Sequence, residues 1–378
     1  MAILSATSDH HFMRMALMMG RRGLGQVAPN PSVGCVLVKD GHVVGRGTTQ
    51  PGGRPHAEVA AIAAAQDRFG PNVTKGATAY VTLEPCAHQG KSPPCTSALI
   101  AAGVTRVVSA MEDPNPAVAG QGHTQLEAAG MTVTTGVLAQ DAQRSHAGFL
   151  TVLEHDRPMV MLKFGTSLDG RIATHTGQSQ WITGSAARAR AHLMRARFDG
   201  ILVGLGTALA DDPSLTCRLP GLEGRSPTRI VLDSHLRLPL TANLVRTASD
   251  VRTIILTREG AEKARRKAFE KAGVEVVGIP VPKAGAEGVP LDAALEQLAL
   301  RGISRLLVEG GSQVAGSLLA LGLVDMISWF RAGGVIGGDG LPAIEAFGID
   351  KLVNMPRYQL SRQEKLGEDL LDIWVKQP

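Results

Sequence analysis

The chain of 378 residues is longer than one hydrophobic core usually supports, so we expect two domains. Its net charge of +5 is modest and only 3% of its residues are aromatic, which argues against a basic surface that stacks nucleic-acid bases. This charge is more compatible with a phosphorylated small molecule as the partner, and we expect no binding to nucleic acid.

Residues 1–23 predict an amphipathic helix, with Phe12, Met15, Ala16 and Met19 on one face. Charged side chains interrupt the apolar residues, so the segment reads neither as a secretory signal nor as a membrane span. We therefore expect a cytoplasmic protein without membrane association. In that reducing compartment, neighbouring cysteines serve metal binding or catalysis more often than a disulfide.

Strand-like and helix-like segments alternate along the first half of the chain. Two apolar runs around residues 39–41 predict a β-hairpin at 32–47. An alanine-rich helix begins near His56 and ends at Gly70. A strand, a helix and a second strand follow at residues 77–83, 96–103 and 104–110. This alternation is typical of a layered α/β domain.

A polar stretch at residues 148–160 interrupts the pattern, and we place the domain boundary there, between 1–152 and 153–378. Beyond it a second alternation predicts another α/β domain. We expect strands at residues 158–167, 200–206, 228–234, 251–257, 305–311 and 324–330, and helices at 185–198, 261–273 and 312–322. Residues 280–290 read as a loop.

Cys86 and Cys95 flank a segment rich in proline and glycine, and His56 stands upstream of both. One histidine and two thiolates leave the fourth position of zinc open for water, which is the arrangement of a catalytic site. Zinc lowers the pKa of that water to about 7, so hydroxide is available at neutral pH. Glu58 follows His56 at the start of a helix and can carry a proton from the water to a leaving amine, as in zinc nucleobase deaminases.

A structural zinc site is the alternative interpretation of these residues. Such a site usually has four protein ligands, and His88 is the nearest candidate for the fourth. A structural site would not explain the acid at position 58, so we favour the catalytic interpretation. Cys35 and Cys217 lie in apolar runs and are interpreted as small buried hydrophobic residues.

The surrounding segments resemble the deaminase half of the bifunctional riboflavin-biosynthesis deaminase–reductases. The resemblance rests on the segments PNPSVGCVLVKDG, PHAEV, GATAYVTLEPCAHQGKSPPC, IAAGVTRVV and DPNPAVAGQG. Residues 87–94 separate the two cysteines, whereas nucleic-acid and cytidine deaminases of this superfamily generally have Pro-Cys-x-x-Cys. The resemblance implies that His56, Cys86 and Cys95 hold zinc and that Glu58 transfers protons. It also suggests that Asn30 contacts the pyrimidine, although Asn30 is equally well explained as shaping an Asn-Pro turn.

In the second half, a glycine-rich strand-to-helix turn is the clearest signal. Gly204 and Gly206 lack the third glycine of the Rossmann fingerprint. In RLLVEGGSQVAG, by contrast, a buried strand leads through Gly310 and Gly311 into a helix. Free backbone amides at such a helix start favour phosphate. A tight turn alone would explain the glycines but not Glu309 at the tip of the strand.

The resemblance continues through SLDGR, SQWIT, LADDPSLT, RIVLDS and VEGGSQVAGSLL, which look like the family's reductase half. That half is similar in fold to dihydrofolate reductase and uses NADPH. Family positions that line the cofactor match Gly165, Trp181, Thr207, Asp211, Ser234, Gly311, Ser312, Gln313, Val314, Ala315, Gly316 and Ser317. Positions that hold the substrate match Ser179, Arg195, Leu215, Arg218, Glu309 and Lys163, with Asp169 in the same segment. The arginines suit a phosphate because guanidinium binds oxyanions bidentately.

Together these observations predict a cytidine-deaminase-like three-layer domain followed by a dihydrofolate-reductase-like domain. We expect zinc-dependent deamination of 2,5-diamino-6-(5-phosphoribosylamino)pyrimidin-4-one, and then NADPH reduction of the ribosyl to a ribityl chain, in a homo-oligomer. A nucleic-acid base deaminase with an accessory domain is the alternative, and a non-catalytic zinc-stabilised binding protein is another. A third is that only one half is active, because the chain reads FRAGGVIGG where the family often has an aromatic–x–Ala–Pro–Lys segment.

Overall fold

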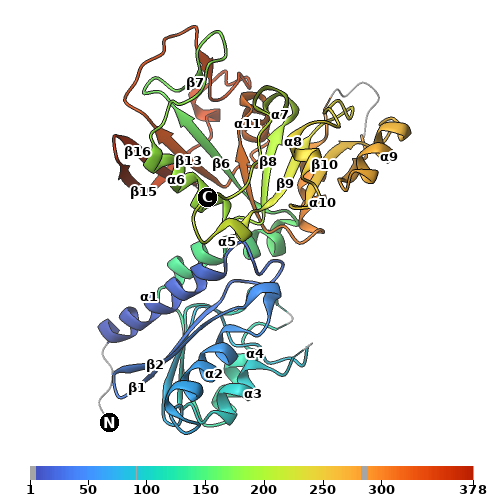
Figure 1. Ribbon diagram of the computed structural model, residues 1–378. Coiled ribbons are helices and arrows are strands. Elements are labelled where there is room, and N and C mark those ends of the chain that lie inside the picture. The colour runs from blue at the N-terminus through green and yellow to red at the C-terminus, as the bar shows by residue number, and fades with distance from the viewer. Residues whose placement is uncertain (1–5, 91, 117, 282–287, 378) are drawn as a thin grey trace. The chain divides into compact units, whose positions relative to one another are not determined.

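The computed structural model describes residues 6–90, 92–116, 118–281 and 288–377, which form two compact units (Figure 1). The units are Met1–Asp156 and Arg157–Pro378. The boundary expected at 152/153 falls inside helix α5 (Ala139–His155), which continues to the end of the first unit. Part of the loop predicted at 280–290, residues 282–287, lies outside the described residues.

The first unit is built on a five-stranded sheet in the order β2-β1-β3-β4-β5. The strands β1 and β2 form the hairpin predicted from the sequence, and both neighbours of β1 run antiparallel to it. The pairs β3–β4 and β4–β5 are parallel. The strand bounds are β1 Gly34–Lys39, β2 His42–Thr48, β3 Thr78–Val81, β4 Arg106–Ser109 and β5 Thr132–Thr134.

Helices cover both faces of this sheet, because β1 is a continuous run of buried apolar residues whose side chains point alternately to the two faces. Cys35 and Leu37 join the core beneath α2, α3 and α4, whereas Val36 and Val38 join the core beneath α1 and α5. The unit therefore has three layers. The helix bounds are α1 Ala6–Gly23, α2 Ala57–Phe69, α3 Cys95–Ala101, α4 Gln121–Ala128 and α5 Ala139–His155.

Helix α2 lies unusually close to strand β2, because β2 carries glycine where the two elements meet. A Cβ atom at Gly45 would overlap the carbonyl oxygen of Ala61, and one at Gly47 would overlap that of Ala57. Any larger residue at either position would push the helix outward. The two glycines therefore fix the position of the helix that begins just after His56.

Helix α5 differs from the expectation that residues 148–160 are a polar break. The helix continues through that stretch to His155 because it buries Ala142 and His146 and packs Phe149 against the core. The mixed composition that suggested a break is that of an amphipathic helix with one apolar face.

The second unit contains a nine-stranded sheet in the order β11-β10-β9-β8-β12-β6-β13-β16-β15. The strands from β11 to β13 are parallel, and β16 and β15 add antiparallel pairs at one edge. The strand bounds are β6 Met159–Thr166, β8 Gly200–Gly204, β9 Thr228–Leu232, β10 Thr253–Arg258, β11 Glu275–Ile279, β12 Arg305–Glu309, β13 Met326–Arg331, β15 Tyr358–Leu366 and β16 Asp369–Lys376. A small sheet pairs β7 (Arg171–Ala173) with β14 (Leu341–Pro342).

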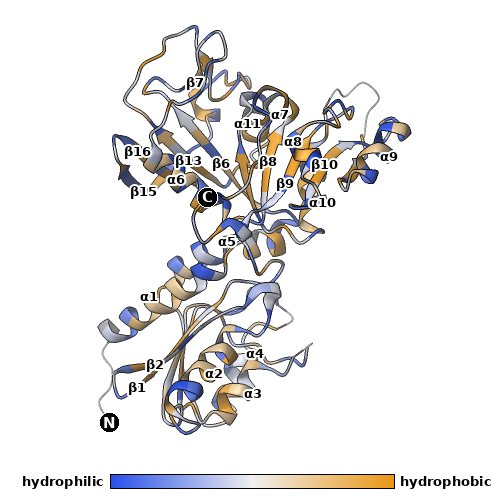
Figure 2. Ribbon diagram, in the orientation of Figure 1, coloured by the Kyte–Doolittle hydropathy of each residue, from blue (hydrophilic) through white to orange (hydrophobic). Residues whose placement is uncertain are grey.

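The central strands of this sheet are hydrophobic and buried on both faces, as parallel strands usually are (Figure 2). Helices α10 and α11 pack on one face, and α6 covers the other through a contact between Met194 and Ser328 of β13. The helix bounds are α6 Ser185–Arg195, α7 Leu205–Asp211, α8 Asn243–Arg246, α9 Lys263–Lys271, α10 Leu291–Ala299 and α11 Ser312–Ala320. The strand predicted at 200–206 ends at Gly204, where α7 begins.

An ion pair fixes the first residue of the second unit. Arg157 donates through both terminal guanidinium nitrogens to Asp325, at 2.7 and 2.8 Å. The same carboxylate accepts the backbone N–H of Val160 at 2.8 Å, at the start of β6. Asp325 thus anchors the first residues of the second unit to the nine-stranded sheet. Across the described residues, no helix is both long and apolar enough to span a membrane.

Candidate functional site

Three side chains with metal-binding atoms meet at the starts of two helices in the first unit. His56 immediately precedes α2, and Cys95 is the first residue of α3. Cys86 lies in the segment that joins β3 to α3. Because helix N-termini carry partial positive charge, they favour the thiolate forms that bind metals.

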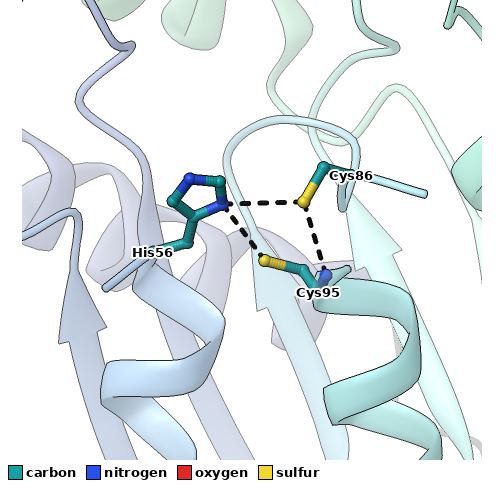
Figure 3. A group of neighbouring side chains, drawn as sticks. All are labelled: His56, Cys86 and Cys95. Carbon is teal, nitrogen blue, oxygen red and sulfur yellow. Dashed lines mark hydrogen bonds between the residues drawn. The ribbon is translucent and has the colours of Figure 1, made fainter. Parts of the chain in front are cut away.

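The three side chains point toward one another (Figure 3). The Nδ1 atom of His56 lies 3.6 Å from Sγ of Cys86 and 3.3 Å from Sγ of Cys95. Tetrahedral zinc, with bonds of about 2.0 Å to nitrogen and 2.3 Å to sulfur, requires N···S separations of about 3.5 Å. The cysteines are free thiols, and the backbone N–H of Cys95 donates to the sulfur of Cys86 at 3.3 Å. The donor set and its spacing therefore fit zinc.

The cluster has three members among the described residues, and His88 is not one of them. A closed structural zinc site would need a fourth protein ligand, whereas a catalytic site leaves that position open. The geometry therefore favours the catalytic interpretation over the structural one.

Glu58 lies in the first turn of α2, and only 3% of its surface is exposed. Burial raises the pKa of its carboxyl group to about 7. Hydrogen bonds from the Cys95 thiol and then from His56 lower the pKa of the Cys86 thiol to about 4. A carboxyl group whose pKa lies near neutral pH suits general acid–base catalysis, and the readily formed thiolate beside it suits metal binding.

Asn30 and Glu84 shape the segments next to the cluster. The side chain of Asn30 packs directly on Gly53, in the turn that leads to His56, and a Cβ at position 53 would overlap its amide. The buried carboxylate of Glu84 accepts the backbone N–H groups of Asp113 and Gly120, in the loop after β4, and of Gly122, in the first turn of α4, at 2.7–3.0 Å. The sequence analysis missed Glu84; an acid at the end of a buried strand was the available signal.

The second unit contains a cavity of about 1270 Å³ at the carboxyl ends of its parallel strands, which we call the strand-end cavity. Its volume exceeds that of most single-ligand pockets, so it can hold a dinucleotide with a substrate. Most of the residues predicted for the second half line it. These are Lys163, Gly165, Ser179, Trp181, Arg195, Thr207, Asp211, Leu215, Arg218, Ser234, Glu309, Gly311, Ser312, Gln313 and Val314.

The remaining predicted residues of the second half are not among those that line the cavity. Ala315 and Gly316 are buried within α11, where Gly316 lies so close to Glu345 that a Cβ would come within 2.9 Å of its carbonyl oxygen. Ser317 continues the same helix. Asp169 accepts N–H groups from Ile336 and Gly337, so it holds the loop after β13.

A buried cluster of charges occupies one part of the strand-end cavity. Glu309 receives two hydrogen bonds from the guanidinium of Arg195, both at 2.8 Å, and Lys163 Nζ lies 3.6 Å from the same carboxylate. Burial opposes ionisation of Glu309, but the two cations prevail and lower its pKa to about 2. Arg195 also donates to the carbonyl of Thr216 at 3.1 Å. Its bidentate face is therefore already engaged by protein.

The glycine-rich turn lies at the end of β12, as the sequence predicted. Gly310 and Gly311 have φ values of 81° and 88°, which favour glycine. Ser312 begins α11 directly after the turn, and Thr207 of α7 lies against both glycines. Backbone amides and a helix start thus face the cavity together, as a phosphate site requires.

Two cavity residues on α6, Arg188 and His192, were missed by the sequence analysis. They line the cavity together with the predicted Arg195, because the three lie one helical turn apart on one face of α6. The guanidinium of Arg188 lies 4.7 Å from the ring centre of Trp181. Helical spacing of basic residues was the signal that could have found them. Arg237 also lines the cavity, and no motif pointed to it.

Comparison with protein families assigns each unit separately. Residues 6–111 match the cytidine and deoxycytidylate deaminase zinc-binding region, and residues 158–371 match the RibD C-terminal domain. The chain is 40% identical over 363 residues to the riboflavin biosynthesis protein RibD of Bacillus amyloliquefaciens, covering 96% of this chain and 95% of that one. It is 40% identical over 376 residues to RibD of Escherichia coli K12, covering 96% and 98%.

Solved structures agree over the same length. RibD of Acinetobacter baumannii superposes with a TM-score of 0.85 at 34% identity, over 99% of this chain and all of that one. A diaminohydroxyphosphoribosylaminopyrimidine deaminase/5-amino-6-(5-phosphoribosylamino)uracil reductase from Thermotoga maritima superposes with a TM-score of 0.83, also at 34% identity, over 98% and 99%. The predicted fold class is confirmed. The chain belongs to the RibD family, the bifunctional deaminase–reductases of riboflavin biosynthesis that use zinc in the first domain and NADPH in the second.

Proposed function

We propose that the first unit deaminates 2,5-diamino-6-(5-phosphoribosylamino)pyrimidin-4-one and that the second unit reduces the ribosyl group of the product to a ribityl chain. The relative from T. maritima is named for these two activities. One observation carries the proposal: a three-ligand cluster with a buried acid and a large phosphate-suited cavity occur in the two units of one chain.

In the deamination, His56, Cys86 and Cys95 would hold zinc through one nitrogen and two sulfur atoms. The ion would supply a water of lowered pKa for attack on the ring carbon that bears the amino group. The carboxylate of Glu58 accepts a proton from the water and delivers it to the departing amino nitrogen. Water and the C–NH₂ group thereby become a carbonyl group and ammonia. Asn30, which lies against the turn before His56, contacts the pyrimidine.

In the reduction, bound NADPH would supply a hydride to C1′ of the ribosyl group, and the ring oxygen would gain a proton as the C1′–O bond breaks and the ring opens. Glu309 is ionised at neutral pH, because its pKa is about 2, and therefore accepts hydrogen bonds from the substrate. Burial raises the pKa of Asp211, so Asp211 is the better proton carrier of the two carboxyl groups. Arg195 and Lys163 orient Glu309, and the exposed Arg218 is left to bind the substrate phosphate.

The glycine turn from Gly311 and the start of α11, which line the strand-end cavity, would hold the diphosphate of the coenzyme through backbone N–H groups. Thr207, Ser234, Gly165 and Trp181 also line the cavity and would contact the coenzyme. Positioning of C1′ against the nicotinamide supplies much of the rate, since the reaction needs little further acid–base chemistry.

The partners and location follow from the same proposal. We expect small-molecule substrates and no nucleic acid, because more residues, 87–94, separate the two cysteines than in nucleic-acid deaminases. We expect a cytoplasmic protein. We also expect a homo-oligomer, because Leu352 and Val353 are 79% and 80% exposed and offer apolar surface for association. Light scattering on the purified protein measures the oligomeric state.

A two-step assay tests the proposal on zinc-loaded protein. Ammonia release from the diaminopyrimidine is measured first, and NADPH oxidation with the deaminated product is measured separately. Glu58→Gln should abolish ammonia release and leave NADPH oxidation intact. Asp67→Asn, which removes an exposed carboxylate from the same helix α2, is the matched control and should change neither. Ammonia release by Glu58→Gln at the wild-type rate would contradict the assignment of Glu58.

A further inference from the structure

The segment that follows α7 carries two of the predicted substrate residues on an irregular stretch of chain. We call residues 212–218 the Leu215 loop. Leu215 and Arg218 of this loop line the strand-end cavity, and so does Pro213. The loop forms neither helix nor strand, so no regular ladder of backbone hydrogen bonds fixes its course. The placement of its cavity residues therefore depends on contacts with other elements.

Two residues of the Leu215 loop have a left-handed backbone although neither is glycine. The φ values are 37° at Asp212 and 52° at Leu215. A residue with a Cβ atom rarely adopts this conformation, which persists only where the surrounding structure holds it. Leu215 is the less favourable case, because leucine lacks the short polar side chain that helps aspartate in such turns.

Asn243, the first residue of α8, contacts the loop on both sides of Pro213. Its backbone N–H donates to the carboxylate of Asp212 at 2.7 Å, and its side-chain amide donates to the hydroxyl group of Ser214 at 3.0 Å. These contacts fix the two positions just before Leu215 and Pro213. Asn243 itself is not among the residues that line the cavity. It can therefore influence a ligand only through the loop.

Arg229 of β9 holds α8 in turn. Its guanidinium donates to the carbonyl oxygens of Leu244 and Thr247 at 3.2 and 2.8 Å, and to the hydroxyl group of Thr247 at 2.7 Å. The last carbonyl groups of a helix have no partner within the helix, so these bonds secure the end of α8. Arg229 also reaches the loop directly, at 3.4 Å from the carbonyl oxygen of Ser214.

Core filling alone does not explain Arg229. Its side chain is fully buried, and its hydrogen bonds, including those to Val251 and Thr253, go to uncharged oxygen atoms. Burial lowers its pKa to about 10. An apolar side chain would fill such a space at lower cost in free energy than a charge without a counter-ion. What the guanidinium adds is a fixed connection between β9, α8 and the Leu215 loop.

The later part of the loop is held by residues that also face the cavity. The carbonyl oxygen of Thr216 accepts a hydrogen bond from Arg195 at 3.1 Å and lies 3.1 Å from Nδ1 of His192. Both partners line the cavity, so substituting them would also change direct contacts with a ligand. Asn243 and Arg229 lie outside the lining, and their effect on the loop can be tested separately.

We propose that Asn243 and Arg229 are positioning residues of the reductase, which hold the Leu215 loop so that Leu215 and Arg218 meet the phosphoribosyl substrate. The proposal rests on the proposed function of the second unit. It makes substrate binding and turnover depend on two residues that contact neither substrate nor coenzyme. The affinity for NADPH should not depend on them, because the glycine turn follows a different strand, β12.

Steady-state kinetics with the deaminated product tests this proposal. Asn243→Ala retains the backbone N–H and loses only the amide bond to Ser214. The value of kcat/KM for the phosphoribosyl substrate should fall about tenfold, because one hydrogen bond is lost and small displacements disturb orientation. The Kd for NADPH, titrated without substrate, should stay within about twofold of wild type. Equal losses in both quantities would show general damage and overturn the proposal.

A double-mutant cycle identifies the path of the effect. Ser214→Ala removes the hydroxyl group that accepts the amide bond. Combined with Asn243→Ala, it should lower kcat/KM no further than the larger single loss, because both substitutions remove the same bond. Additive losses would show that Asn243 does not act through Ser214, which overturns its assignment. Arg246→Ala, at an exposed arginine of α8 outside the cavity lining, is the control and should retain wild-type kinetics.

Arg229→Lys tests the buried guanidinium. The variant keeps the positive charge, but an ammonium group cannot replace the planar fork that joins several carbonyl groups. It should lower kcat/KM at least as much as Asn243→Ala does, with NADPH affinity within about twofold of wild type. A folded variant with wild-type kcat/KM and a lower unfolding temperature would show a merely structural role and overturn the assignment of Arg229. The cycle of Asn243 and Ser214 decides the proposal if Arg229→Lys does not fold.

The wild-type protein separates this inference from the function on which it rests. Wild-type protein that does not oxidise NADPH with the deaminated product would contradict the proposed reductase function. An active wild type together with unchanged kinetics in Asn243→Ala would overturn the positioning role alone.

Discussion

The metal cluster of the first unit and the strand-end cavity of the second are specified by the sequence in different ways. The cluster gathers residues from two helix starts and one joining segment, all carried by short motifs. The cavity gathers residues from the ends of several parallel strands and from one face of α6. Short motifs therefore reveal the first site, whereas the second depends on the order of strands in a sheet.

The two sites also treat a buried carboxyl group in opposite ways. Burial raises the pKa of Glu58 to about 7, and the negative charge of the nearby Cys86 sulfur acts in the same direction. Burial also disfavours ionisation of Glu309, but Arg195 and Lys163 outweigh it and lower the pKa to about 2. Equal burial thus yields a proton carrier in one unit and a permanent anion in the other.

Loss of the metal should produce the largest effect and should affect one unit only. Cys86→Ser, or treatment with a chelator, should reduce ammonia release at least about a thousandfold, because the water is no longer activated and the ligand set is incomplete. NADPH oxidation with the deaminated product should continue at the wild-type rate. Cys35→Ser, at a cysteine outside the cluster, is the control. A parallel loss of both activities would contradict the separation of the two sites.

Neutralising Glu309 should affect the second unit only and should depend on pH. Its folded-state pKa of about 2 lies below the ordinary value of 4.5, so ionised Glu309 stabilises the fold above pH 4.5, and this contribution is lost as the pH falls toward 2. The contribution is up to about 3 kcal/mol at neutral pH. Glu309→Gln should therefore be less stable at pH 7, with less further loss between pH 4.5 and 2.

Tryptophan fluorescence can follow this unfolding selectively. All three tryptophans of the chain, Trp181, Trp329 and Trp374, lie in the second unit. Glu259→Gln, which removes an exposed carboxylate from the same unit, should retain the wild-type dependence on pH. If Glu309→Gln loses as much stability as the wild type between pH 4.5 and 2, the pair with Arg195 contributes no such stabilisation.

Displacing α2 should weaken the metal site without changing any ligand. In Gly47→Ala the new methyl group overlaps the carbonyl of Ala57, so α2 must move outward with His56 at its start. Overpacking of this kind costs about 1–3 kcal/mol of stability. Competition with a coloured chelator should show weaker zinc binding. Gly260→Ala, where a Cβ meets no atom within 4 Å, should bind zinc normally.

The smallest expected effect concerns a tether far from the chemistry of either site. Asp9 of α1 accepts hydrogen bonds from Arg106 at 2.8 and 2.9 Å and from Tyr80 at 2.8 Å. Asp9→Asn should cost about 2 kcal/mol in the free energy of unfolding. Asp141→Asn removes only an exposed ion pair with Arg144 and should stay within about 0.5 kcal/mol. Equal losses of unfolding free energy for Asp9→Asn and Asp141→Asn, measured by denaturant unfolding, would contradict this prediction.

The sequence predicted most elements of both units and the whole metal cluster, because these depend on local patterns. The hairpin, the helix after His56 and the strand–Gly310–Gly311–helix turn are confirmed. The prediction of a polar break at 148–160 was wrong, because α5 continues through this stretch and its apolar face is interspersed with polar residues in the sequence. Helix propensity and polarity alone do not show which face a core will cover.

Site residues that act through tertiary contacts were harder to predict. The cavity-lining Arg188 and His192 are ordinary helix residues until α6 is placed over the strand ends. The contacts of Glu84 depend on a distant part of the chain, because the backbone N–H of Asp113, which donates to its carboxylate, lies 29 positions downstream. Conversely, motif matching extended the predicted cofactor-binding residues along α11 as far as Ser317. The later residues of that helix are not among those that line the cavity.

The ion pair between Arg157 and Asp325 indicates where the chain can be divided into two separate polypeptides. The first residue of the second unit already belongs to that unit's own fold, and α5 ends immediately before it, with Asp156 closing the helix. A break after Asp156 would leave every metal ligand in one polypeptide and every cavity residue, with the anchor of β6, in the other. A break only one residue later would detach Arg157 and leave Asp325 without its cation.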